Sequence, residues 1–232
     1  MSGDSGANRP QQAADTASAL AAAKIPPSKL GPARHARLTD GDRELYFWIL
    51  RRFATDGRPS SADVRAVAER LALDRDDAFA TLAREDLVHR GADGEITVAY
   101  PFSGRPTAHR VRFTSGHEVD AMCAIDALGI APMFAESIEI ESRDPLSGDE
   151  IRARVAADGT AAWWPSSAVV VAGAIRSEGD DACSGCCPAL NFFASPANAE
   201  RWLAEHLDVP GKVISVDEAA AAGRAVFGDA LT

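Results

Sequence analysis

The sequence predicts an α+β protein in which a winged-helix-like unit of three helices precedes a domain built on a mixed or antiparallel sheet with helices. Two patterns support this prediction. Apolar residues recur with helical spacing through most of residues 39–100, and short alternating strands interspersed with helices follow from residue 101 onward. We therefore expect a first unit over residues 39–100 and a second over residues 101–232.

The first unit is expected to contain three helices, over residues 42–53, 62–71 and 75–87. Each of these segments places its apolar residues on one face. Residues 95–100 then alternate with a period of two, which is typical of a strand that ends a β-hairpin. Three helices and a hairpin together give the winged-helix-like arrangement.

The charge of the chain argues against the DNA-binding role that this arrangement invites. The formal net charge is -10, and the third helix carries Asp76, Asp77, Glu85 and Asp86. DNA phosphates would repel that face. We expect a packing module and no nucleic-acid partner.

The second unit alternates between strands and helices. A helix is expected over residues 121–128 with Asp120 as its cap, another begins at Ser195-Pro196, and a closing helix covers residues 217–227. The expected strands cover residues 110–114, 137–141, 151–155, 168–172, 190–193 and 212–216.

Residues 1–38 are rich in Ala, Ser, Gly, Gln and Pro, and we expect them to form a disordered leader. Their most apolar stretch is too short for a signal peptide, and the chain has no apolar run long enough to span a membrane. These features predict a cytoplasmic protein without a membrane partner, whose cysteines stay reduced.

All four cysteines lie in two short segments, Met122–Asp126 and Cys183–Pro188. Cys123 is three residues before Asp126, which puts thiol and carboxyl on the same face of a helix. If the site is partly desolvated, Asp126 can take a proton from the thiol and later give it away. The alternative is a core cysteine beside a surface aspartate.

The Cys183-x-x-Cys186 spacing also suggests a thioredoxin-like redox motif or, together with Cys123 and Cys187, a tetrahedral zinc site. A strand rather than a helix is expected after it, which is the wrong context for thioredoxin. Thiolates also bind soft, thiophilic metals, for which two ligands are enough.

The two cysteine segments together resemble those of the organomercurial lyase (alkylmercury lyase) family. The matching motifs are Cys123-Ala-Ile-Asp126, a hydrophobic stretch that contains Pro132, and Cys187-Pro-Ala-Leu-Asn-Phe-Phe-Ala-Ser195. The resemblance implies that residues 101–232 form the catalytic domain, with Cys123, Asp126 and Cys187 as catalytic residues. The same three would hold mercury, and a one-residue gap would select Cys186 as the second thiol. The family often has a structural cysteine where this chain has Asp144.

The resemblance further implies protonolysis of carbon–mercury bonds to give a hydrocarbon and Hg(II), as part of mercury detoxification. No cofactor is expected, because mercury enters as substrate and leaves as product, but free low-molecular-weight thiols would be needed for turnover. A mercuric reductase would be a partner that receives Hg(II). Two alternatives are a non-catalytic thiol protein that binds or senses soft metals, and a thiol oxidoreductase that uses Cys183 and Cys186.

Overall fold

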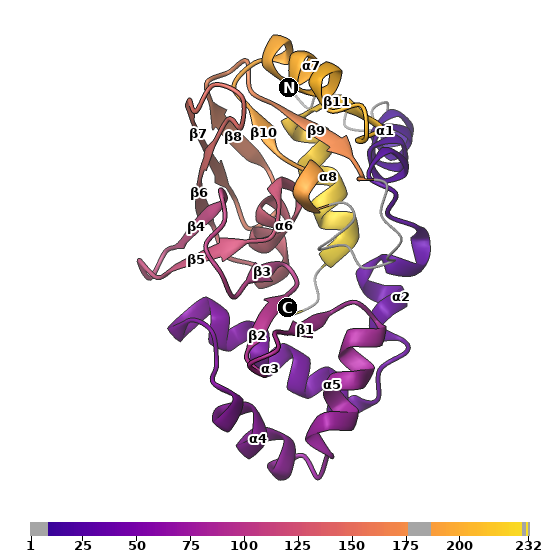
Figure 1. The fold of residues 1–232 in the computed structure, drawn as a ribbon, viewed down its shortest axis with the longest axis vertical. Coiled ribbons are helices and arrows are strands. Elements are labelled where there is room, and N and C mark those ends of the chain that lie inside the picture. Colours follow the sequence, from indigo (N-terminus) through magenta and orange to yellow (C-terminus); the bar gives the residue numbers. More distant parts are fainter. Residues whose placement is uncertain (1–8, 176–186, 229–230, 232) are drawn as a thin grey trace, which may run out of the picture.

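A large antiparallel sheet organises the fold (Figure 1). The computed structural model describes residues 9–175, 187–228 and 231. In these ranges the strand order of the sheet is β1-β2-β3-β5-β4-β6-β7-β8, and every neighbouring pair is antiparallel. Together with the helices packed around it, this sheet confirms the predicted α+β class.

The first unit has the predicted three helices and hairpin, at the lower end of the molecule in Figure 1. Side chains at each helix start explain where the helices begin: Thr39, Ser60 and Asp74 each accept a hydrogen bond from a backbone N–H of the first turn. The elements are α3 (Asp40–Asp56), α4 (Ser61–Arg70), α5 (Arg75–Arg84), β1 (Val88–Arg90) and β2 (Ile96–Ala99). The third helix is shorter than predicted, because the chain leaves it through Asp86 at φ 55°.

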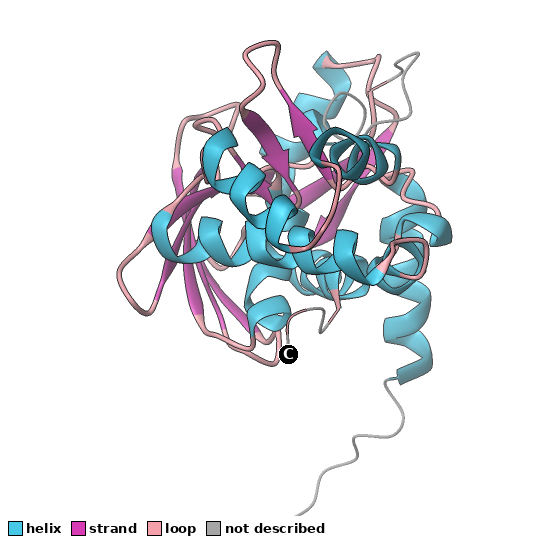
Figure 2. Ribbon diagram, turned by 90° about the horizontal axis from the view of Figure 1, so that it is seen from below, coloured by secondary structure: helices cyan, strands magenta, loops and turns pink. Residues whose placement is uncertain are grey.

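The central strands alternate buried and exposed residues, so one face of the sheet packs on the core and the other is open. Figure 2 shows the helices gathered on one side of these strands. Because β1 and β2 belong to the same sheet, it continues across the expected boundary at residue 100. The other strands are β3 (Phe102–Ser103), β4 (Arg110–Phe113), β5 (Glu118–Ala121), β6 (Ile138–Arg143), β7 (Glu150–Val155) and β8 (Ala161–Trp164).

Helix α6 (Ala124–Phe134) lies in the centre, where it contacts β5 and β6 and packs closely against α8 (Val216–Phe227). Two glycines allow this approach: a Cβ on Gly129 would lie 2.9 Å from the carbonyl oxygen of Gly223. A second sheet has the order β10-β9-β11, and α7 (Pro196–Glu205) packs against all three of its strands. Its strands are β9 (Val169–Gly173), β10 (Phe192–Phe193) and β11 (Gly211–Ser215).

The expectation of a disordered leader over residues 1–38 is wrong for the described part, which begins at Arg9. Helix α1 (Arg9–Ala22), the short 3-10 helix η1 (Pro27–Lys29) and helix α2 (Gly31–His35) occupy it. Ala19 is fully buried, and α1 packs against α8 and β9. An alanine-rich helix carries little apolar signal in the sequence, and its stability comes from this tertiary packing. Residues 1–8 lie outside the described ranges.

The expected cap of the central helix is also corrected. Asp120 lies within β5, where its carboxylate accepts a hydrogen bond from the backbone N–H of Thr107, and Cys123 is the residue that caps α6. Across the described ranges, every helix is too short or too polar to cross a membrane.

Candidate active site

The structure brings together the three residues that the sequence singled out. Cys123 precedes α6, Asp126 lies in its first turn, and Cys187 begins the 3-10 helix η2 (Cys187–Ala189). One ligand atom from each residue, two Sγ atoms and a carboxylate oxygen, lies within 4.8 Å of the other two. All three side chains are buried, and Asp126 is only 5% exposed. The alternative of a core cysteine beside a surface aspartate is therefore wrong.

Backbone hydrogen bonds hold the two cysteine segments side by side, although they are about sixty residues apart. Ala124 N–H donates to the carbonyl oxygen of Leu190 over 2.9 Å, and Leu190 N–H donates to the carbonyl oxygen of Cys187 over 3.2 Å. The Cys123 sulfur accepts from the backbone N–H of Asp126 over 3.4 Å, as an N-cap side chain does. The start of α6 therefore fixes the position of the Cys123 thiol. The 3-10 helix η2, whose segment is hydrogen-bonded to the start of α6, fixes the position of the Cys187 thiol.

The carboxyl of Asp126 holds a proton far more readily than an ordinary aspartate. Burial raises its pKa from 3.8 to about 7, against the opposing effects of a hydrogen bond with Cys123, the charge of Arg34 and a hydrogen bond with Cys187. The Cys187 thiol donates to Asp126 Oδ2 over 3.7 Å. A carboxyl with this pKa can both accept and release a proton near neutral pH.

Two sulfurs at this separation suit a single soft metal ion. A metal–thiolate bond is about 2.3 Å long for zinc, so two such bonds in line span about 4.6 Å. The three ligand atoms lie within a comparable distance of one another. The site can therefore bind one thiophilic ion between two sulfurs and place a protonated carboxyl beside it.

Sequence reasoning missed the aromatic side of the site. The hydroxyl of Tyr100, just after β2, lies 3.6 Å from the Cys187 sulfur. Burial raises the pKa of Tyr100 far above its ordinary value, so the group stays a neutral hydroxyl. The strand before it was predicted, but nothing in its pattern indicates which side chain meets a cysteine 87 residues further on.

The sequence also provided no indication of a charged cluster next to the Tyr100 ring, because two of its members, Lys29 and Arg34, lie in the segment expected to be a disordered leader. Lys29 Nζ donates to Asp86 Oδ2 over 2.9 Å, and His89 Nε2 lies 2.8 Å from Asp86 Oδ1. Arg34 donates to the backbone carbonyl of Asp86 over 3.1 Å. Burial opposes ionisation of Asp86, but the hydrogen bonds with His89 and Lys29 outweigh it and lower the pKa. This cluster joins the N-terminal segment to the end of α5.

Asp144 is a buried carboxylate that accepts four hydrogen bonds. It is 1% exposed. Burial opposes its ionisation, but hydrogen bonds from Asn198 and from backbone N–H groups lower its pKa. The donors are Asn198 Nδ2 at 2.7 Å and the backbone N–H groups of Ala194, Leu146 and Ser147 at 2.8, 2.8 and 3.1 Å. The residue therefore ties the β6–β7 turn to the start of α7.

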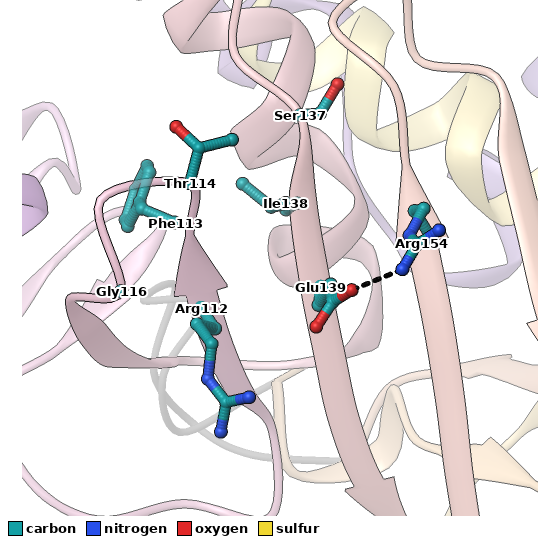
Figure 3. Close-up of a pocket in the computed structure, with 8 residues that line it drawn as sticks. All are labelled: Arg112, Phe113, Thr114, Gly116, Ser137, Ile138, Glu139 and Arg154. Carbon is teal, nitrogen blue, oxygen red and sulfur yellow. Dashed lines mark hydrogen bonds and ion pairs between the residues drawn. The ribbon is translucent and has the colours of Figure 1, made fainter.

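Cys183 and Cys186 lie outside the described residues, as do the redox pair and the four-cysteine zinc site that would use them. One described hollow, with a volume of about 290 Å³, lies away from the thiols on the open face of the sheet (Figure 3). Its lining includes Arg112, Phe113 and Ile138, and Glu139 of β6 forms an ion pair there with Arg154 of β7. We assign it no role.

The site therefore combines two buried thiols with a carboxyl that can be protonated near neutral pH, a donor set that suits a soft metal ion. Comparison with known proteins narrows the class of protein. The sequence model of the alkylmercury lyase family (MerB) matches residues 102–228, and the chain belongs to this family.

Individual relatives agree with this assignment. The alkylmercury lyases of Bacillus cereus and Clostridium butyricum are each 37% identical over 122 residues, which are 51% of this chain and 53% of theirs. That of Staphylococcus epidermidis is 31% identical over 127 residues, 55% of this chain and 57% of its own. The chain thus matches about half the length of these curated relatives.

A solved structure described as the mercury-bound form of MerB2 is similar in fold. Its TM-score is 0.68 at 18% identity, and the match covers 95% of this chain and 99% of that one. At this identity, the likeness supports the fold alone.

Proposed function

We propose that the protein is an organomercurial lyase, which cleaves carbon–mercury bonds by protonolysis to give a hydrocarbon and Hg(II). The observation that supports this most directly is the buried cluster of Cys123, Asp126 and Cys187, with three ligand atoms within 4.8 Å of one another. Family membership supplies the substrate class, and the cluster supplies the two ligands and the proton donor that the reaction needs.

In the proposed reaction, the carboxylate of Asp126 first takes the proton of a neighbouring thiol. The resulting thiolate bonds to the mercury of the substrate R–Hg–SR′, and the displaced small-molecule thiolate takes this first proton from Asp126 and leaves as R′SH. The carboxylate of Asp126 then takes the proton of the second thiol, whose thiolate adds to the mercury. Two sulfur ligands push electron density onto the carbon. Protonated Asp126 then gives its proton to that carbon, which keeps the electron pair of the broken Hg–C bond and leaves as R–H. Hg(II) remains between Cys123 and Cys187, with Asp126 beside it.

The raised pKa of Asp126 is what allows one group to perform these proton transfers. At an ordinary pKa of 3.8, only about one carboxyl in a thousand would be protonated at pH 7, whereas a pKa of about 7 gives about half. The burial of the site therefore increases the population of the proton-donating form several hundredfold.

The proposal extends to the partners of the reaction. Hg(II) bound to two buried thiolates leaves by exchange with low-molecular-weight thiols, and a mercuric reductase would then receive it. The proposed reaction requires no resident cofactor, because mercury enters as substrate and leaves as product. A cytoplasmic location would keep both cysteines reduced, as the mechanism requires.

Headspace gas chromatography tests the proposal. The protein is incubated with phenylmercury and excess thiol, and benzene is measured against a matched sample of the Asp126→Ala variant. Release of benzene by the first sample alone is the expected result. Stoichiometric binding of mercury without benzene would instead indicate a protein that binds or senses the metal.

A further inference from the structure

One contact crosses from the first unit into the thiol site. The Tyr100 hydroxyl lies 3.6 Å from Cys187 Sγ, and Tyr100 is 2% exposed. We propose that Tyr100 is a positioning residue for Cys187: its hydroxyl donates a hydrogen bond to the sulfur and holds that sulfur against Asp126. This inference deepens the proposed function, because the two share one site.

The geometry around the sulfur gives the direction of this hydrogen bond. Cys187 has a single S–H proton, and the thiol uses it to donate to Asp126 Oδ2 over 3.7 Å. While the Asp126 carboxyl is ionised, Tyr100 is then the donor in its own contact with the sulfur. When the thiol proton passes to Asp126, the tyrosine hydroxyl continues to donate to the thiolate, and hydrogen bonds to a charged acceptor are the stronger kind.

The tyrosine is itself held in place on several sides. Its N–H donates to the carbonyl oxygen of Leu87 over 3.0 Å, and its own carbonyl oxygen accepts from the Tyr46 hydroxyl over 2.8 Å. The Arg34 guanidinium carbon lies 6.0 Å from the centre of the ring, and the His89 ring meets it edge-on at 6.4 Å. The hydroxyl therefore has a fixed direction, which a positioning group needs.

This arrangement gives the winged-helix-like unit a part in the chemistry. Tyr100 lies just before the family match, which begins at residue 102, and its supports come from α2, α3 and the β1 segment. Tyr100 and the residues that hold it in place therefore lie outside the part of the chain that the family model matches.

Infrared spectroscopy of the S–H stretch tests the contact without depending on turnover. In a full-length background with Cys123, Cys183 and Cys186 changed to Ser, Cys187 gives the only S–H band. We expect Tyr100→Phe to move this band to higher frequency, because the sulfur loses the donor that polarises its S–H bond. Ser142→Ala is the control: it also removes a buried hydroxyl, but one whose hydrogen-bond partner is His109 Nδ1 at 2.9 Å and not one of the residues that hold Tyr100.

Turnover supplies the second readout. In the otherwise unsubstituted chain, Tyr100→Phe should lower kcat for phenylmercury by about tenfold, and Ser142→Ala by no more than about twofold. An S–H band that Tyr100→Phe leaves in place, or that both variants move equally, would overturn the proposal. If the unsubstituted chain releases no benzene, the proposed lyase function is wrong. The S–H band would still show whether the Tyr100 hydroxyl donates a hydrogen bond to the Cys187 sulfur.

Discussion

Replacing Asp126 by Asn should remove a loss of stability that the wild type shows as the pH rises from about 4 to about 8, and it also removes the proton donor. The carboxyl has a pKa of about 7 in the folded state and about 3.8 in the unfolded chain. As the pH rises between these values, the unfolded state ionises and the folded state does not, so the wild type loses stability. Above about pH 7 both states are ionised, and the loss stays constant.

The size of the effect follows from the two pKa values. One pKa unit corresponds to about 1.4 kcal/mol, so the wild type loses on the order of 4 kcal/mol between about pH 4 and about pH 8. Asn does not ionise, and its variant lacks this loss. The amide must still find partners among the sulfurs, at a cost that does not vary with pH. The change in the stability difference between the two pH values is therefore the quantity to measure.

Urea unfolding of both proteins at about pH 4 and about pH 8 provides that quantity. Asp144→Asn is the matched control, since it removes another buried carboxylate whose pKa is lowered instead. The stabilising contribution of Asp144 is present above its unfolded pKa and lost as the pH falls through the folded pKa, so this variant should be less stable than the wild type at pH 8, by about 1–3 kcal/mol. A difference between Asp126→Asn and wild type that stays constant with pH would refute the reasoning.

Three further predictions concern the thiols, the helix packing and the N-terminal segment. Cys187→Ser should abolish benzene release and Cys186→Ser should not, and the opposite result in gas chromatography would reassign the second thiol. Gly223→Ala should lower the free energy of unfolding by about 1–3 kcal/mol in urea titrations, because its Cβ would lie 2.6 Å from the carbonyl oxygen of Ile125; an unchanged midpoint would contradict that close packing. Ala19→Glu should destabilise the protein by about 2 kcal/mol or more in the same assay, because it places a charge where α1 packs against α8; a neutral effect would indicate an unpacked leader.

The elements that the sequence predicted well are those with a strong period. Residues 137–141 alternate, and β6 follows with alternating burial. The helix ends were less predictable, because they depend on single capping contacts. The α6 cap is an example: Asp120 is the more usual cap residue, but it belongs to a strand, and the Cys123 sulfur takes that place.

The site was predictable only as far as its chemistry shows in short motifs. Cys123, Asp126 and Cys187 were found because two thiols and a carboxyl are unusual side chains in suggestive spacing, and their spatial proximity is now observed. Tyr100 and Arg34 look ordinary in sequence. Their roles arise from tertiary contacts that no local pattern encodes, and Arg34 lies in a segment whose composition predicts disorder.

The two buried aspartates show that burial alone does not set a carboxyl's pKa. Asp126 and Asp144 are 5% and 1% exposed, yet burial dominates at the first and hydrogen bonds dominate at the second. The difference lies in the donors: Asp144 accepts from one side-chain amide and three backbone N–H groups, whereas the partners of Asp126 are thiols, which are weak donors. The same sulfurs that would bind mercury thus leave the carboxylate poorly stabilised. A serine at position 187 would supply a stronger donor, so it should lower the pKa of Asp126 as well as remove a mercury ligand.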